Sequence, residues 1–501
     1  MVVIRSVPQD RRGLPPMPLS VIKTTFAAGV AGALLGALAL PAASDAAPRQ
    51  PVTPLGSLVQ LAGKSGCLVD RSAATSRCTT VRALKGPAPF LGSEAVSLSP
   101  DGRHLYVASS GSNAIAIFRR SALTGKLTQA AGSAGCVASR GAGGCARGLG
   151  LVGPNSVAVS PDGRNVYATS LKSDAVSVFH RDRVTGRLTQ LKGGQACLSG
   201  SKASGCASGR ALKGPDVVRV SPDGRNVYVG SFLGNALAVF ARDASTGALK
   251  QPGGTAGCVV AVAASGCGTA NALGAPEGLA VSQDGANVYV ANALTNAIGV
   301  YARNASTGAL KQVSGKAGCI GDTPVAGSPP AGCGSGVQLS GANALVVSPD
   351  DADVYVTSLF SNSVTSFSRG SNGHLKQKSG TSACLVYLLA VGCSLGRTLE
   401  APEGLAVSPD GANVYVAAFT SNAVDVLNRS VDTGALLQKS RRPGCVTVKV
   451  TPDCSLGRAL VGVSSFAISP DGRYVYAGAF ASNAVSVFER VTPPSPPDGL
   501  G

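Results

Sequence analysis

The chain has 501 residues, a formal net charge of +18, 14 cysteines and no tryptophan. Its three histidines, His104, His180 and His374, are scattered along the sequence, which argues against Ser-His-Asp catalysis and against a histidine-rich metal site. The Lys and Arg residues are spread along the chain without a dense run, so we expect the charge to act mainly on solubility and to leave anionic envelope polymers as candidate partners.

Residues 1–46 have the features of a secretory signal peptide. Lys23 precedes an apolar run over 26–40, and Ser44-Asp45-Ala46 supplies the small residues that signal peptidase reads. The run is too short to predict a membrane span. Met17 is an alternative start, and residues 47–54 form a linker. We therefore expect a protein secreted to the exterior or the cell envelope, where nucleic acid is not a natural partner.

A tyrosine recurs along the rest of the chain with a nearly fixed period. It stands at Tyr106, Tyr167, Tyr228, Tyr289, Tyr355, Tyr415 and Tyr476. A fixed period indicates a supersecondary unit that cannot bury its apolar face alone, so the copies must stack into a solenoid or close into a ring. The repeat therefore predicts one large domain, although the length alone would suggest several.

The unit around Tyr167 shows what is repeated. Four short β-rich runs are expected at 156–159, 165–169, 175–179 and 187–190, with turns at Ser160-Pro161-Asp162-Gly163 and Val184-Thr185-Gly186. Four short antiparallel strands without helical periodicity are typical of a propeller blade.

The two ends of the repeat region complement each other. Residues 56–61 match a fourth strand such as 186–191, whereas the last copy supplies only three strands, at 466–468, 474–477 and 484–488. The first strand should complete the last blade and remove a free sheet edge. We predict an all-β, seven-bladed β-propeller of four-stranded blades over residues 55–490, followed by a Pro-rich tail over 491–501.

The cysteines form one pair in each unit. The pairs are Cys67 and Cys78, Cys136 and Cys145, Cys197 and Cys206, Cys258 and Cys267, Cys319 and Cys333, Cys384 and Cys393, and Cys445 and Cys454. Zinc sites favour closer spacing, so the pairs indicate disulfides and an oxidising compartment. Local pairing is favoured, and pairing across units, such as Cys78 with Cys136, stays open.

Two phrases carry a family resemblance. Residues 159–167, Val-Ser-Pro-Asp-Gly-Arg-Asn-Val-Tyr, and 296–301, Asn-Ala-Ile-Gly-Val-Tyr, resemble the YVTN-type repeats of lactonase-like seven-bladed propellers, which include relatives of 6-phosphogluconolactonase and 3-carboxymuconate cyclase. The resemblance implies ring opening of a lactone by water near the channel mouth. Members commonly carry a Pro-His-His pattern before the innermost strand, where this chain has Pro154-Asn155-Ser156 and Pro276-Glu277-Gly278.

The residues twelve positions before each tyrosine are all polar. They are Glu94, Asn155, Asp216, Glu277, Asn343, Glu403 and Ser464, which we call the polar ring. In a propeller they should surround the channel mouth and bind a ligand. The carboxylates of Glu94, Asp216, Glu277 and Glu403 could hold a hard cation such as calcium, the one cofactor considered. Alternatively, each side chain caps the backbone of its own loop.

A second series is nearly uniform and is therefore expected to be architectural. Seven residues after each tyrosine stand Asn113, Asp174, Asn235, Asn296, Asn362, Asn422 and Asn483, a residue type that tolerates left-handed backbone. Function should instead be sought where one copy differs from the others.

Arg219 is such an exception, because the other units carry Ser, Ala or Val at its position. It should either pair with Asp216 or Glu277 or act as an anion or oxyanion ligand. Arg219, Glu277 and Asp216 are thus the candidate catalytic residues. Asp425 is a weaker exception, for which we expect an exposed position.

Two functions fit these features. In the first, a secreted enzyme hydrolyses or cyclises a small lactone or sugar lactone at the channel mouth. In the second, a non-catalytic propeller uses the same face to recognise an envelope glycan or protein. In both cases a monomer is expected, with a small molecule or an envelope polymer as partner.

Overall fold

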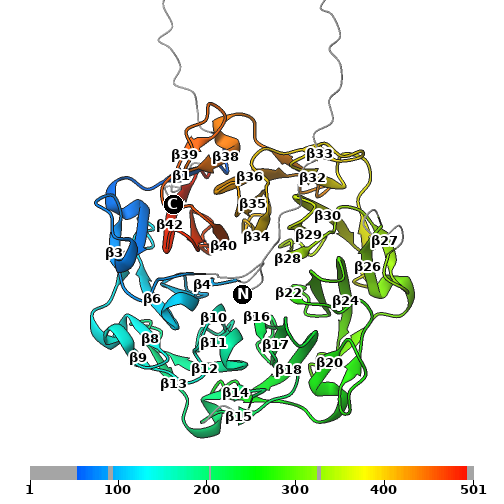
Figure 1. The fold of residues 1–501 in the computed structure, drawn as a ribbon. Coiled ribbons are helices and arrows are strands. Elements are labelled where there is room, and N and C mark those ends of the chain that lie inside the picture. The colour runs from blue at the N-terminus through cyan, green and yellow to red at the C-terminus, as the bar shows by residue number, and fades with distance from the viewer. Residues whose placement is uncertain (1–53, 88–93, 202–204, 324–328, 494–501) are drawn as a thin grey trace, which may run out of the picture. The chain divides into compact units, whose positions relative to one another are not determined.

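Seven sheets of six strands each surround one axis (Figure 1). The computed structural model describes residues 54–87, 94–201, 205–323 and 329–493. The sheets confirm the predicted all-β, seven-bladed propeller. The predicted signal segment lies outside the described residues. Within the described part of the chain, no helix is long and apolar enough to cross a membrane.

Three long strands form the inner part of each blade. The innermost strands, which number blades 1 to 7, are β4 (Val96–Leu98), β10 (Pro154–Val159), β16 (Pro215–Val220), β22 (Pro276–Val281), β28 (Ala342–Val347), β34 (Pro402–Val407) and β40 (Val463–Ile468). The second strands are β5 (His104–Ser109), β11 (Asn165–Ser170), β17 (Asn226–Ser231), β23 (Asn287–Asn292), β29 (Asp353–Ser358), β35 (Asn413–Ala418) and β41 (Tyr474–Ala479). The third strands are β6 (Ala114–Arg120), β12 (Ala175–Arg181), β18 (Ala236–Arg242), β24 (Ala297–Arg303), β30 (Ser363–Arg369), β36 (Ala423–Arg429) and β42 (Ala484–Arg490).

The outer part of each blade contains three short strands instead of one. The fourth strands are β1 (Leu58–Gln60), β7 (Leu127–Gln129), β13 (Leu188–Gln190), β19 (Leu249–Lys250), β25 (Leu310–Gln312), β31 (Leu375–Gln377) and β37 (Leu436–Gln438). The strands that begin with cysteine are β2 (Cys67–Asp70), β8 (Cys136–Ala138), β14 (Cys197–Ser199), β20 (Cys258–Val260), β26 (Cys319–Asp322), β32 (Cys384–Val386) and β38 (Cys445–Thr447). The outermost strands are β3 (Thr79–Val81), β9 (Ala146–Arg147), β15 (Ala207–Ser208), β21 (Gly268–Thr269), β27 (Gly334–Gly336), β33 (Ser394–Leu395) and β39 (Ser455–Leu456).

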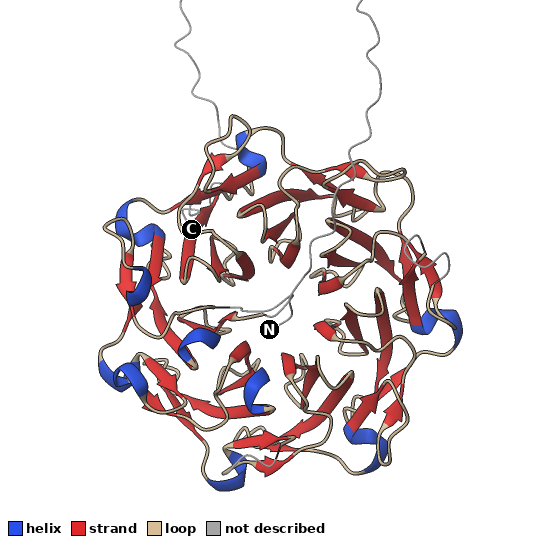
Figure 2. Cartoon of the chain, in the orientation of Figure 1, coloured by secondary structure: helices blue, strands red, loops and turns tan. Residues whose placement is uncertain are grey.

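Short 3-10 turns connect these strands (Figure 2). They are η1 (Gly63–Gly66), η2 (Arg71–Ala73), η3 (Ser110–Ser112), η4 (Gly132–Ala134), η5 (Ala142–Gly144), η6 (Leu171–Ser173), η7 (Gly193–Gln195), η8 (Gly254–Gly257), η9 (Gly315–Gly318) and η10 (Arg442–Gly444). Because of η7, β13 and β14 share one edge of β12: β13 pairs with its last three residues and β14 with its first three. The expected fourth strand is therefore divided in two, and β15 adds a parallel strand outside it.

The amino-terminal strands complete the last blade, as predicted. Leu58 of β1 lies opposite Arg490 of β42, and Cys67 of β2 lies opposite Ser486 of the same strand. All seven cysteine pairs form disulfides within their own unit, so the local alternative is correct.

The repeated tyrosine belongs to a clamp between neighbouring blades. Tyr106 is fully buried, and its hydroxyl donates to the Gly186 carbonyl of blade 2 at 2.9 Å. Arg181 of blade 2 donates from Nε to the same hydroxyl at 2.8 Å and from Nη2 to the Asp101 carboxylate at 2.9 Å. Equivalent Arg–Asp ion pairs join every pair of adjacent blades. Two turn residues and two strand residues thus fix each blade against the next.

The asparagine series is also architectural, as expected. Asn235 has a left-handed backbone with φ 45°, and its Oδ1 accepts a hydrogen bond from the Ala275 backbone of the next blade at 2.8 Å. The same arrangement occurs at the other six members of the series.

Candidate functional site

The polar ring is set into the innermost strands by a repeated β-bulge. In blade 2, Pro154 lies opposite Ser170 and Ser156 lies opposite Thr169, so Asn155 has no partner on the second strand. Asp216, Glu277, Asn343, Glu403 and Ser464 occupy the same bulge position in blades 3 to 7. A bulge changes the direction of a side chain, and it disturbs only one position of the strand. In blade 1, Glu94 lies two residues before β4.

The six bulge residues are buried, each exposing at most 4% of its surface. Two of them make contacts that connect blades. The Asn155 amide donates to the Asp216 carboxylate, and the Asn343 amide donates to the Pro402 carbonyl at 3.0 Å. Asn343 Oδ1 also accepts from its neighbouring backbone amide and from Thr357, at 2.9 and 2.8 Å. The capping alternative therefore describes Asn343 well.

The carboxyl groups of the ring are much less completely bonded. Neither oxygen of Glu277 has a hydrogen-bond partner among the described residues, nor does one oxygen of Asp216. Burial raises the pKa of Glu277 well above its usual value, and the nearby charges of Asp216 and Glu403 raise it further. Burial likewise raises the pKa of Asp216 strongly and that of Glu403 to about 8. Burial thus favours the protonated form of all three groups, and a protonated carboxyl can act as a general acid.

Arg219 does not pair with Asp216 or Glu277, contrary to the sequence-based expectation. Its guanidinium forms an ion pair with Glu94, which belongs to blade 1, two blades away from blade 3. Burial disfavours the charged forms of Asp216 and Glu277 and so weakens their attraction for a cation, whereas the Glu94 side chain is 34% exposed. Burial lowers the pKa of Arg219 to about 10, so the side chain stays cationic at neutral pH.

A cavity of about 500 Å³ opens beside Arg219. Its walls come from the innermost strands of blades 3, 4 and 5 and from the Ser-Pro-Asp-Gly turns of blades 1 to 3. The lining residues are Pro100, Pro161, Arg219, Val220, Pro222, Ala280, Val281, Gln283, Leu345, Val346 and Val347. Arg219 is the one charged side chain among them. The cavity therefore combines an apolar wall with a single cation, as small-molecule sites commonly do.

The structure gives no support to a calcium site in the ring. Among the described residues, no group of three or more His, Cys, Asp or Glu side chains is arranged to hold a metal ion. Glu94 is instead committed to Arg219, and Asp216 to Asn155.

Asp425 differs from expectation because it is fully buried rather than exposed. Its Oδ1 accepts hydrogen bonds from Thr398 and, at 2.6 Å, from Gln438. It therefore lies inside blade 6, away from the ring.

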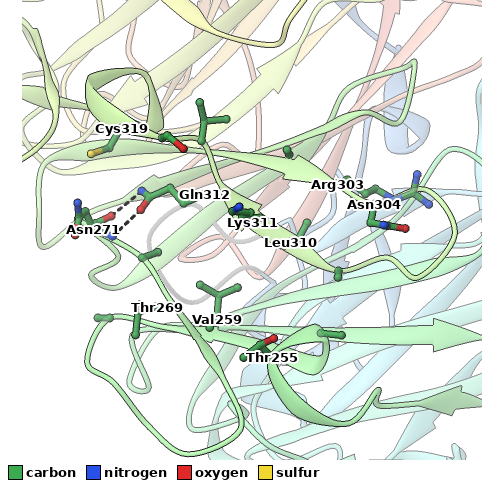
Figure 3. Close-up of a pocket in the computed structure, with 18 of the residues that line it drawn as sticks. Thr255, Val259, Thr269, Asn271, Arg303, Asn304, Leu310, Lys311, Gln312 and Cys319 are labelled. Atoms are coloured by element: carbon green, nitrogen blue, oxygen red, sulfur yellow. Dashed lines mark hydrogen bonds between the residues drawn. The ribbon is translucent and has the colours of Figure 1, made fainter.

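A larger cavity of about 960 Å³ lies between the outer strands of blades 3 and 4 (Figure 3). There Gln312 accepts from the Asn271 backbone amide at 2.7 Å and donates to the Asn271 carbonyl at 3.0 Å, as the dashed lines show. The same glutamine contact recurs in other blades, for example between Gln190 and Leu149. A contact that the repeat copies indicates architecture, so the axial cavity is the better candidate site.

Two parts of the site escaped sequence reasoning. The bulge cannot be recognised from the sequence of the strand that contains it, because the polar residue looks like one more strand residue. The prolines of the Ser-Pro-Asp-Gly turns were recognised only as turn residues, although Pro100, Pro161 and Pro222 line the cavity. Their recurrence in six of the seven units, with Gln283 in the remaining one, was the available signal.

A family model of seven-bladed propellers agrees with the fold. The family model of the lactonase, 7-bladed beta-propeller, matches residues 72–201 and 207–325. A Pseudomonas aeruginosa periplasmic gluconolactonase is 21% identical, with 68% of this chain and 82% of that one covered at a TM-score of 0.46. A Bacteroides fragilis protein assigned as a 6-phosphogluconolactonase is 17% identical, with 68% and 81% covered at 0.45.

Hydrazine synthase of Kuenenia stuttgartiensis is also similar, at 18% identity, with 80% of this chain and 97% of that one covered at a TM-score of 0.44. No curated protein sequence matches the chain. Structures this distant carry no argument about activity, because one fold serves many functions.

Proposed function

Because the chain is a lactonase-like seven-bladed β-propeller, we propose that it opens a small lactone by hydrolysis in the axial cavity beside Arg219. One observation carries this proposal. Arg219, the residue that breaks the repeat, lines an apolar cavity at the axis and pairs with a carboxylate there. A catalytic site needs only one copy of each of its groups, whereas the packing of seven blades needs seven copies of each packing residue.

In this reaction a water oxygen bonds to the lactone carbonyl carbon and the carbonyl oxygen becomes an oxyanion. The ring C–O bond then breaks, the leaving alkoxide takes up a proton, and a hydroxy acid is released. Arg219 would stabilise the oxyanion or hold an anionic substituent of the substrate, since a guanidinium donates several hydrogen bonds in a fixed geometry. Displacement of Glu94 by the substrate would free the Arg219 guanidinium for either role.

None of the ring carboxyls lines the axial cavity, so a role for them in proton transfer requires that the substrate reach beyond it towards the bulges. A group whose pKa lies near the working pH can both accept and return a proton, and the pKa of Glu403 is about 8. Burial also favours the protonated forms of Glu277 and Asp216, which would act as acids. Hydrolysis consumes no cofactor. Cyclisation of a hydroxy acid would use the same groups in reverse.

We also propose that the protein is secreted and acts as a monomer on a small molecule. Seven disulfides within the described residues support an oxidising environment. The alternative, a non-catalytic propeller that recognises an envelope glycan or protein, is favoured by the burial of the polar ring and by the blade-linking bonds of Asn155 and Asn343.

A panel of five- and six-membered lactones, with and without anionic substituents, separates the two functions. Arg219→Ala should lower kcat/KM by about 100-fold or more, the usual loss when an oxyanion donor is removed. Arg225→Ala is the matched control, because it removes the same charge from an exposed position in the turn that follows β16. Equal rates for wild type and Arg219→Ala, or no hydrolysis of any lactone, would contradict the assignment.

A further inference from the structure

A third cavity, of about 710 Å³, lies over the second, third and fourth strands of blade 1 and shares no lining residue with the axial cavity. Four cationic side chains line it, namely Arg103, Arg119, Arg120 and Lys126, and no acidic side chain does. Arg120 is buried and belongs to the blade clamp, because it bonds to Asp471 and to the Tyr476 hydroxyl. The other three are exposed.

The strand register places these cations together. His104 on β5 lies opposite Arg119 on β6, which lies opposite Thr128 on β7, so the three residues form one row across the blade. Lys126 comes directly before β7, and Arg103 directly before β5. In the described part of the chain, the side chains of Arg103, Arg119 and Lys126 form no ion pair.

The same three positions differ in the other blades, so the fold does not require cations there. Blades 4 and 6 have alanine at the Arg103 position, as Ala286 and Ala412, and blades 3 and 4 have alanine at the Arg119 position, as Ala241 and Ala302. Blades 3, 4 and 6 have alanine at the Lys126 position, as Ala248, Ala309 and Ala435. Blade 1 is the one blade that carries Arg or Lys at all three.

The charges of Arg103, Arg119 and Lys126 are not neutralised by any acidic residue of the cavity lining. Burial lowers the pKa of His104 to about 4, and the positive charges of Arg181, Arg119 and Arg103 lower it further, outweighing the opposite effect of Asp101. His104 is therefore neutral. Its Nδ1 lies 2.8 Å from Arg181 Nη2, and its Nε2 has no partner among the described residues. The blade 1 cavity thus has a net positive potential and an unused donor at its inner wall.

We propose that this cavity binds a phosphate group, with Arg103, Arg119 and Lys126 as its ligands. Three cations more than balance the two negative charges of a dianionic phosphate, and guanidinium groups bind its oxygens in pairs. The cavity is larger than a phosphate ion, and the exposed side chains of Leu123 and Val184 lie at its lining, where they would contact the apolar part of the ligand. The phosphate can come from a small phosphate ester or from an anionic polymer.

Isothermal titration at low ionic strength tests this site, with inorganic phosphate and a short polyphosphate as the two probes. The triple variant Arg103→Ala, Arg119→Ala, Lys126→Ala installs side chains that sister blades already carry, so it should fold normally. It should weaken binding of the bound probe at least tenfold. The matched control is Lys250→Ala, Lys311→Ala, Lys376→Ala, which removes three exposed charges from other blades and should leave binding unchanged.

Binding of inorganic phosphate that the cavity variant loses and the control keeps would support a site for small phosphates. Binding of polyphosphate alone, with the same difference between variants, would support a polymer site. Equal weakening in both triple variants would show a general charge effect and overturn the proposal, as would failure of both probes to bind wild type. Lactone hydrolysis by the cavity variant should equal wild type, which separates this site from the axial one.

Discussion

The polar groups at the blade interfaces and those at the axis differ in how completely they are paired. At the interfaces, Arg181 and its six counterparts meet an aspartate and, in most blades, a tyrosine, so that charge is balanced within each contact. At the axis, Glu277 lies buried with both oxygens unbonded among the described residues. The interfaces use polar groups for stability, whereas the axis keeps groups that cost stability, which is the usual sign of a functional region.

The largest effect is expected from breaking one clamp. Arg181→Ala leaves Asp101 and Tyr106 without their buried cation and should lower the free energy of unfolding by about 3 to 5 kcal/mol. Chemical denaturation monitored by circular dichroism measures the change. Arg164→Ala, an exposed residue of the turn after β10, should change stability by less than about 0.5 kcal/mol. Similar values for both variants would show that the clamp adds little.

A carboxyl at the axis should make the free energy of unfolding fall as the pH rises, an effect that the interface ion pairs should not produce. The pKa of Glu403 is about 8 in the folded protein and 4.5 in a model peptide, so the folded state keeps a proton that the unfolded state releases. Its contribution to stability is present below pH 4.5 and is lost as the pH rises towards 8, at about 1.4 kcal/mol per pH unit.

Glu403→Gln should therefore unfold with a weaker pH dependence between pH 5 and 8, with up to about 4 kcal/mol less loss than wild type. Denaturation at several pH values measures it, and Glu489→Gln, an exposed residue of β42, serves as control. Parallel curves for wild type and Glu403→Gln would mean that Glu403 is ionised in the folded protein.

A smaller effect is expected from removing one disulfide of an outer loop, because each disulfide connects residues within a single unit. The disulfide between Cys258 and Cys267 closes a short loop with a sequence separation of 9. Replacing both residues by alanine should lower the unfolding free energy by about 2 to 3 kcal/mol, because a short loop restricts the unfolded chain only modestly. Thermal denaturation without reductant measures it. A loss larger than that of Arg181→Ala would show that the disulfide stabilises the protein more than the blade clamp does.

Periodic features could be predicted from the sequence, and contacts between periods could not. The tyrosine spacing gave the seven blades, and the match between residues 56–61 and the fourth strands gave the closure through β1. By contrast, the Arg219 partner lies two blades away, and nothing in the spacing distinguishes Glu94 from Asp216. Burial disfavours the charged form of Asp216, and only the folded chain defines which carboxyls are buried.

The pairing of β1 with β42 also sets an order of events during synthesis. Gln60 meets Phe488 in the finished sheet, so the partner of this strand is made more than 400 residues later. At typical elongation rates of roughly 5 to 20 residues per second, β1 waits for tens of seconds before its partner exists. The ring therefore cannot close on the growing chain until β42 has been made.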